Sequence, residues 1–272
     1  MESTSQNQLF TAYWTGYQKS INTLDTTPSG VDQVILAFFG PLDNKVEITF
    51  ITSIYSAEQL KSWIKVVKKK GIKVIASLLD TPQTHWNTVD MEQFSKSLST
   101  LIEEWGFDGI DIDAESGMPS SQYVSSFISL IKTCRSLLPE GATLSYTCYL
   151  GLESYDGEIL KETIDLIDTV QLMAYGDDFD SMVALFNNYN QIVPAEKLII
   201  GVKAGTTPLQ EVVKLTEWNS AKKGGMMLWN LPLDTIRYSN KPRWSYFQAI
   251  LNNIKRGDKN HYNNVRRTWW FV

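Results

Sequence analysis

The chain has 272 residues, of which 43% are hydrophobic and 12% aromatic, and its formal net charge is −5. A single α/β barrel typically has ~250 residues, so this length and composition suit one large domain with an extensive core. The negative charge argues against nucleic acid and anionic membranes as main partners, and it suits a neutral or weakly cationic ligand such as a sugar. The two cysteines, Cys134 and Cys148, lack the spacing of a metal or redox site and require no oxidising compartment.

The N-terminal segment MESTSQNQLF does not contain a basic region followed by an apolar core, which is the pattern of a secretory signal. The chain also has no run of about 18 apolar residues, so no transmembrane helix is expected. These features predict a cytoplasmic protein. Export by another route, or a signal that has been trimmed away, is the alternative.

Eight short apolar runs predict strands of a parallel sheet, and helical patterns fill most of the gaps between them. The runs cover residues 11–17, 33–40, 73–80, 107–115, 143–150, 169–175, 197–205 and 224–231. In the helical pattern at 56–71, Leu60, Trp63, Ile64 and Val67 share one face. Eight repeats predict a (β/α)8 TIM barrel of the α/β class, with an open doubly wound sheet as the alternative. No glycine-rich phosphate loop follows the first strand, which weakens the alternative.

The pattern predicts a single domain, because no change in composition marks a second one. We expect residues 9–257 to form the barrel, residues 1–8 a flexible N-terminus and residues 258–272 a C-terminal tail. Only residues 176–196 separate the sixth run from the seventh, so no inserted α/β domain is expected. The protein is expected to be a monomer.

The fourth predicted strand contains the sequence GFDGIDIDAES, in which acidic and apolar residues alternate. Because side chains alternate along a strand, Asp111, Asp113 and Glu115 share one face. Burial of unpaired charge is costly, so we expect the apolar face to meet the helices and the acids to line the barrel interior. Glu115 comes last, at the C-terminal end of the strand, where barrel enzymes have their active sites.

Crowded carboxyl groups cannot all ionise cheaply, so at least one pKa is expected to rise. We expect Asp111 and Asp113 to share a proton, and Glu115 to stay protonated as a general acid. The competing interpretations are a metal site and a solvated edge strand. A hard cation needs several oxygen ligands, and the other strand ends offer few acids. Neither a metal nor a cofactor is therefore predicted.

This segment resembles the D-G-x-D-x-D-x-E signature of family-18 glycoside hydrolases, the chitinase family. The matching positions are Asp108, Gly109, Asp111, Asp113 and Glu115. The stretches VQLMAYGDD and GGMMLWNLPLD resemble the sixth and eighth strands of that family, so the resemblance spans roughly residues 10–256. Two positions depart from the pattern. Gly176 follows Tyr175 where many chitinases have Asp, and Ser77 is followed by Leu-Leu-Asp80 in place of a Ser-x-Gly-Gly turn.

The resemblance implies a mechanism in which the substrate's own N-acetyl oxygen is the nucleophile and closes an oxazolinium ring. Glu115 would protonate the leaving glycosidic oxygen and later activate water. Asp113 would hold the acetamide N–H, Asp111 would lie beneath it, and Tyr175 would orient the acetamide oxygen. Trp229 would form the apolar floor under the sugar. For Tyr175 and Trp229 the alternative is a structural side chain of the barrel.

Four further residues are predicted to contact the substrate. Gln171 suits a sugar contact and a hydrogen bond inside the barrel equally well, and Met173 is expected to pack against the acetamide pocket. Trp14 and Trp86 lie at the barrel mouth by their position, where an aromatic ring stacks on a neighbouring sugar. For Trp86, an anchoring role in its loop is the alternative.

The function implied is retaining hydrolysis of β-1,4-linked N-acetylglucosamine, with chitin or N-acetylglucosamine oligosaccharides as the partner. A chitinase is favoured because a linear substrate needs stacking aromatics along the mouth. The first alternative is an endo-β-N-acetylglucosaminidase that acts on N-linked glycans. The second is a non-catalytic chitin-binding lectin on the same barrel, against which the presence of Glu115 argues.

Overall fold

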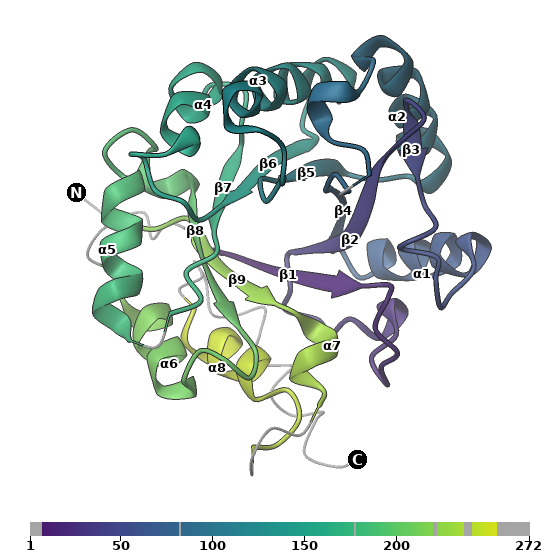
Figure 1. Ribbon diagram of the computed structural model, residues 1–272. Helices are drawn as coiled ribbons and strands as arrows, with labels where there is room; N and C mark the ends of the chain where they lie inside the picture. Colours follow the sequence, from purple (N-terminus) through teal and green to yellow (C-terminus); the bar gives the residue numbers. More distant parts are fainter. Residues whose placement is uncertain (1–6, 82, 177, 220–221, 237–240, 255–272) are drawn as a thin grey trace.

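Eight parallel strands close into a barrel in the computed structural model, which describes residues 7–81, 83–176, 178–219, 222–236 and 241–254 (Figure 1). The strands are β1 (Leu9–Thr15), β2 (Gln33–Leu42), β4 (Lys73–Leu78), β5 (Gly109–Asp113), β6 (Thr143–Cys148), β7 (Thr169–Leu172), β8 (Leu198–Lys203) and β9 (Gly225–Trp229). Each pairs with the next, and β9 pairs with β1 to complete the ring. The predicted single (β/α)8 barrel is therefore confirmed.

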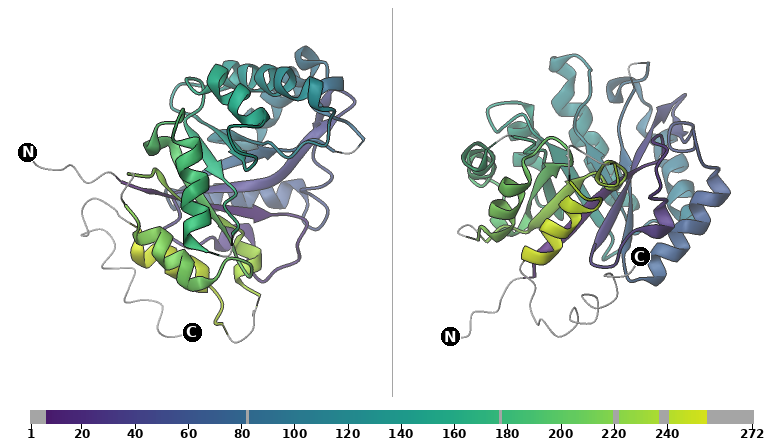
Figure 2. Two further views of the ribbon diagram at one scale, coloured as in Figure 1. Left: turned by 60° about the vertical axis from the view of Figure 1, so that its left-hand side comes forward. Right: turned by 90° about the horizontal axis from the view of Figure 1, so that it is seen from below.

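Helices surround the barrel on its outside (Figures 1 and 2). They are α1 (Ala57–Lys69), α2 (Met91–Trp105), α3 (Ser120–Leu137), α4 (Tyr155–Thr163), α5 (Phe179–Tyr189), α6 (Leu209–Glu217), α7 (Leu231–Asp234) and α8 (Ser245–Asn253). Between β1 and β2 a 3-10 turn (Leu24–Thr26) takes the place of an α-helix. The short strand β3 (Lys45–Glu47) forms an antiparallel hairpin with the end of β2.

The helix before β5 shows how local sequence sets the start of the strand that carries the acids. The Asp90 side chain accepts the backbone N–H groups of Glu92 and Gln93, which caps the N-terminus of α2. The helix ends at Gly106, whose φ of 69° is left-handed and favours glycine. The chain then turns directly into β5, with Asp108 accepting the backbone N–H of Val74 on the neighbouring strand at 2.9 Å.

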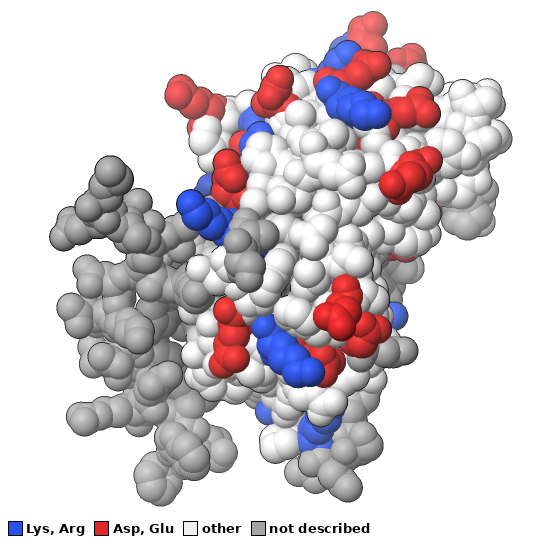
Figure 3. Space-filling view, turned by 90° about the vertical axis from the view of Figure 1, so that its left-hand side faces the viewer, with Lys and Arg blue, Asp and Glu red and all other residues white. Residues whose placement is uncertain are grey.

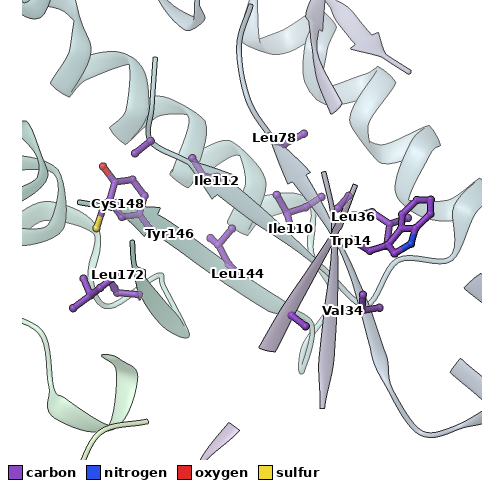
Figure 4. Close-up of a cluster of buried hydrophobic side chains, with 14 of the residues drawn as sticks. Trp14, Val34, Leu36, Leu78, Ile110, Ile112, Leu144, Tyr146, Cys148 and Leu172 are labelled. Carbon is purple, nitrogen blue, oxygen red and sulfur yellow. The ribbon is translucent and has the colours of Figure 1, made fainter. Parts of the chain in front are cut away.

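The strands divide their apolar residues between an outer and an inner layer. Figure 4 shows Ile110 and Ile112 of β5 in one buried cluster with Leu144 of β6 and Trp14 of β1. This outer layer packs against the helices, as the alternation in β5 predicts. The inner layer is smaller and includes Tyr13 of β1, so the barrel interior has room for polar side chains.

The segments expected outside the barrel are described only in part. Residues 1–6 and the tail 258–272 lie outside the described residues, so expectations about them stay predictions. Gln8, which was assigned to a flexible N-terminus, is buried and donates its amide N–H to Asn219 at 3.1 Å.

No helix in the described ranges is long and apolar enough to cross a membrane. On the face drawn in Figure 3, acidic and basic side chains are interspersed among uncharged ones.

Candidate active site

The three acids of the GIDIDAE segment follow one another up the barrel toward the C-terminal ends of the strands. Asp111 and Asp113 belong to β5 and are 0% and 2% exposed. The strand ends at Asp113, two residues earlier than predicted, so Glu115 lies in the loop that follows. Glu115 is exposed at this end. The acids therefore range from a fully buried group to one that a substrate can reach.

Asp111 is surrounded by hydroxyl groups from three other strands, the adjacent β4 and β6 and the non-adjacent β1. It accepts Tyr13 Oη at 2.8 Å, Ser77 Oγ at 2.7 Å, Ser145 Oγ at 2.6 Å and Thr147 Oγ1 at 2.9 Å. Burial raises the pKa of Asp111, and these four donors oppose the increase because they stabilise the carboxylate. Both oxygens of Asp111 are therefore engaged, and its position is fixed from several sides.

Asp113 forms its side-chain hydrogen bond with Glu115. Burial raises the pKa of Asp113 well above its usual value, and the charges of Glu115 and Asp111 raise it further. Burial also raises the pKa of Glu115, while the hydrogen bond from Asp113 and the charge of Lys203 act in the opposite direction. Four hydroxyls already occupy the Asp111 oxygens and Asp113 is hydrogen bonded to Glu115, so the expectation that Asp111 and Asp113 share a proton stays a prediction.

A pocket of about 580 Å³ opens above this pair. Asp113 and Glu115 line it together with Met173, Tyr175 and Trp229, as the sequence predicts for all five. The volume falls within the ~300–1,000 Å³ typical of small-molecule sites. The pocket therefore brings the predicted acids together with a phenol and an indole at the catalytic end of the barrel.

The hydroxyl of Tyr175 is buried and has no hydrogen-bond partner among the described residues. Burial raises the pKa of this phenol well above its usual value, with further contributions from Asp113 and Glu115. The group is consequently a neutral donor and acceptor that a ligand can satisfy. Trp229 packs its ring against Tyr13 with centroids 5.1 Å apart and against Phe38 at 5.8 Å, which fixes the pocket floor.

Two of the predicted sugar platforms lie in the hydrophobic core instead. Trp14 is 0% exposed, donates its indole N–H to the Asn22 carbonyl at 2.9 Å, and packs with Trp63 between β1 and α1. Trp86 is 1% exposed and packs edge-to-face on Phe94 of α2. The prediction of stacking platforms is wrong for both, because each side chain faces the helical layer and has no surface for a sugar.

Gln171 is also inaccessible to substrate. It lies on β7, is 0% exposed and is absent from the pocket lining. Neither its amide oxygen nor its nitrogen has a hydrogen-bond partner in the described part of the chain. Of the two roles predicted equally for Gln171, this structure forms neither among the described residues: its amide makes no hydrogen bond inside the barrel, and its side chain does not line the pocket.

Asp80 is a site residue that the sequence did not identify. It replaces the last position of the Ser-x-Gly-Gly turn, and its Oδ2 accepts His85 Nδ1 at 3.1 Å and the backbone N–H of Trp86 at 3.3 Å. The same oxygen accepts the hydroxyl of Ser116, the residue after Glu115. The signal in the sequence was the acid at the end of the predicted strand 73–80. His85 is thus part of this anchor.

Two more residues near the acids were missed. Lys203, the last residue of β8, lines the pocket with its ammonium 5.8 Å from the centre of the Tyr175 ring. Tyr17 follows β1, and burial together with the charges of Asp113 and Glu115 raises its pKa to about 12. Neither residue belongs to a motif, so only the folded barrel shows that they lie near the acids.

Among the described residues, no group of three His, Cys, Asp or Glu side chains is arranged to hold a metal ion.

Comparison with known proteins places the chain among glycosidase barrels. The family model for the endo-beta-N-acetylglucosaminidase EndoS TIM-barrel domain matches residues 10–223. A GH18 chitinase structure from Pseudoalteromonas aurantia is 20% identical with a TM-score of 0.73, and the match covers 91% of this chain and 100% of that one. A chitinase from Bacteroides thetaiotaomicron is 13% identical with a TM-score of 0.75, covering 93% and 96%. A family-18 N-acetylglucosaminidase from Paenibacillus barengoltzii is 12% identical with a TM-score of 0.67, covering 91% and 100%.

The family match extends over most of the chain and includes the segment with the three acids, Asp111, Asp113 and Glu115. The solved structures share the barrel, and at these identities they show the fold alone. The chain belongs to glycoside hydrolase family 18, in the group described by the EndoS TIM-barrel domain.

Proposed function

We propose that this protein hydrolyses the β-1,4 bond of N-acetylglucosamine oligosaccharides with retention, using the substrate's acetamide as the nucleophile. The observation that carries the proposal is the hydrogen-bonded Asp113–Glu115 pair at the floor of a pocket that also contains the unpartnered Tyr175 hydroxyl. One buried acid, one accessible acid and one free phenol are the groups that this chemistry needs.

Glu115 acts as the general acid in the first step. Burial raises its pKa, so the side chain keeps a proton at a higher pH than an exposed Glu would. It gives this proton to the glycosidic oxygen as the C1–O bond breaks. The acetamide oxygen forms a bond to C1 and closes the oxazolinium ring. The Glu115 carboxylate then removes a proton from the water that attacks C1 and reopens the ring.

Asp113 and Tyr175 hold the acetamide during these steps. The Oδ1 atom of Asp113 has no hydrogen-bond partner among the described residues, so it is free to accept the acetamide N–H. Once the proton of the Asp113–Glu115 hydrogen bond has passed to Glu115, the Asp113 carboxylate also stabilises the positive ring. The Tyr175 hydroxyl donates to the acetamide oxygen. Asp111 remains beneath, held by four hydroxyls, and stabilises the arrangement without contacting the sugar.

Linear chito-oligosaccharides are the substrate that we favour. A continuous series of ring contacts leads from the pocket floor along the β1–β2 side: Trp229 to Phe38 at 5.8 Å, Phe38 to Tyr17 at 6.5 Å, and Tyr17 to Phe50 at 4.5 Å. Phe50, at the outer end, is 50% exposed. Trp229 and Tyr17 are half-buried and Phe50 is exposed, so these three rings suit the apolar faces of successive sugars, while Phe38 is buried between them. They replace Trp14 and Trp86 as the candidate platforms.

An endo-β-N-acetylglucosaminidase acting on N-linked glycans is the second candidate. The matching family model describes such an enzyme, and this supports the candidate directly. The burial of Trp14 and Trp86 also removes two of the three aromatic platforms on which the chitinase prediction rested. A lectin is less well supported, because the catalytic Glu115 is present and hydrogen bonded to Asp113.

Incubation with N-acetylglucosamine tetramers and hexamers, and in parallel with a denatured high-mannose glycoprotein, tests the proposal. We expect shorter oligomers from the former, identified by mass and formed initially with the β-anomeric configuration. Release of intact glycans from the glycoprotein, without cleavage of the oligomers, would select the second candidate. Binding of oligomers without any cleavage by the wild-type protein would select the lectin.

A further inference from the structure

Lys203 is the one Lys, Arg or His among the described residues that line the pocket. It ends β8, where its backbone pairs in register with Trp229 at the pocket floor. Its backbone N–H donates to Thr207 Oγ1 at 3.1 Å, and its carbonyl accepts the N–H groups of Thr206 and Thr207. The base of the side chain is thus held by a tight turn and starts from a fixed position.

The ammonium group of Lys203 contacts a ring and not a carboxylate. Its Nζ lies 5.8 Å from the centre of the Tyr175 ring, within the range of a cation–π contact. Within the described ranges, no carboxylate oxygen comes within 4.0 Å of it to form an ion pair. Several other described lysines do bind carboxylates or carbonyls, such as Lys197, which donates to two carbonyls. The positive charge of Lys203 is therefore not paired with one carboxylate of the described residues and acts on the groups that line the pocket.

The charge that faces Lys203 is concentrated on Glu115 and Asp113. Asp113 of β5 is hydrogen bonded to Glu115. The phenols of Tyr17, after β1, and Tyr175, after β7, also lie near Glu115. Both have raised pKa values, so both phenols stay neutral. The charges of two further acids, Asp111 and Asp80, also raise the pKa of Asp113. Lys203 is thus the only cation acting on Glu115 among these groups.

We propose that Lys203 is a positioning residue for the catalytic pair, whose fixed positive charge keeps one carboxylate of the Asp113–Glu115 pair ionised beside the other. Its contact with the Tyr175 ring holds the ammonium on the acetamide side of the pocket and orders Tyr175 at the same time. The inference rests on the proposed role of Glu115 as proton donor. The physical reason is that two adjacent acids, one of them buried, favour joint protonation when no cation is near, and a fully protonated pair cannot stabilise the oxazolinium charge.

The variant Lys203→Met tests this inference, because Met keeps the length of the stem and removes the charge. We expect the pKa of Glu115 to rise, since a cation that stabilised the carboxylate has been lost. Carboxyl 13C NMR titration reads this change without any substrate, with the Glu115 signal assigned by its absence in Glu115→Gln. In the pH profile of kcat/KM on chitotetraose, the basic limb should move to higher pH. At the pH optimum, kcat/KM should fall by less than the ~10²–10⁴-fold expected for removal of the acid itself.

Three comparison variants make the result decisive. Lys203→Arg keeps the charge and should restore the wild-type titration, whereas Lys203→Gln should behave like Lys203→Met. Lys132→Met, on the exposed face of α3, should leave the titration unchanged. An unchanged Glu115 titration in Lys203→Met, with KM raised, would make Lys203 a simple sugar contact and overturn the inference. If the wild-type protein cleaves no substrate, the proposed function fails, while the NMR titration still decides the role of Lys203.

Discussion

Ser116 donates its hydroxyl proton to Asp80, and this hydrogen bond ties the loop that carries the catalytic acid to the loop after β4. Asp80 is 8% exposed, and the same Oδ2 atom also accepts from His85 and from the backbone of Trp86. One buried carboxylate therefore fixes the residue next to Glu115 to a neighbouring loop. Much of the placement of Glu115 comes from outside its own motif.

The variant Asp80→Ala should lower kcat by roughly 10–100-fold, because small displacements of a catalytic group are costly. KM should change much less, since Asp80 does not line the pocket. Ser116→Ala removes only the hydrogen bond to the Glu115 loop and should reproduce part of the effect. Steady-state kinetics on chitotetraose, with melting temperatures as a control for folding, measure both. A loss confined to KM would contradict a positioning role for Asp80.

The variant Glu115→Gln should keep the fold and sugar binding but lose ~10²–10⁴-fold in kcat, because Gln cannot donate a proton to the leaving oxygen. Glu92→Gln, on the exposed first turn of α2, is the matched control and should retain full activity. Turnover and calorimetric binding of a chito-oligomer measure the two effects separately. Near-normal turnover in Glu115→Gln would assign the acid to another group.

The order of the strands and the barrel class followed from the sequence because both depend on local pattern. Apolar runs of period two and helical faces of period 3.6 are carried by neighbouring residues. The alternation in β5 correctly predicted that Asp111 and Asp113 point inward while Ile110 and Ile112 join the helical layer. The predicted end of this strand was wrong, because β5 ends at Asp113 and Glu115 lies beyond it.

What the sequence did not show depends on contacts between distant residues. Asp111 is satisfied by hydroxyls up to 98 positions away, so its partners could not be inferred from the DxDxE segment. For Trp14 and Trp86, position in or after a strand indicated the barrel mouth, but Trp14 packs against Trp63 of α1 and Trp86 packs against Phe94 of α2. A tryptophan at the end of a strand can face either layer, and only packing decides which.

The variant Trp86→Ala should reduce the free energy of unfolding by ~3–5 kcal/mol, as expected for removing a buried Trp. The affinity of the folded protein for chitin oligomers should stay close to that of the wild type. Phe50→Ala gives the opposite test, because Phe50 is 50% exposed at the end of the ring series. It should leave the melting temperature nearly unchanged and weaken hexamer binding more than dimer binding. Denaturant unfolding and calorimetry distinguish the two patterns, and a selective loss of hexamer affinity in Trp86→Ala would restore its role as a platform.

The variant Ser145→Ala should destabilise the protein more at neutral pH than at acid pH. The folded pKa of Asp111 lies above its ordinary value of 3.8, so its contribution to stability is fully present below pH 3.8 and is lost as pH rises through the folded pKa. Ser145, which donates to Asp111 at 2.6 Å, lowers that folded pKa and so limits the loss.

Without the Ser145 hydroxyl, the ionised Asp111 loses a bond to a charged group, worth ~1.5–3 kcal/mol, whereas the protonated form loses a neutral bond worth ~0.5–1.5 kcal/mol. Urea unfolding of Ser145→Ala and of the wild type at pH 3.5 and pH 7 measures this difference. Ser129→Ala, on the exposed face of α3, should show no pH-dependent change. An equal loss at the two pH values would mean that Asp111 carries the same charge at both, and the raised pKa would then have to be abandoned as the cause. A larger loss at pH 7 would establish that the hydroxyl cage around Asp111 exists to hold a carboxylate beneath the catalytic pair.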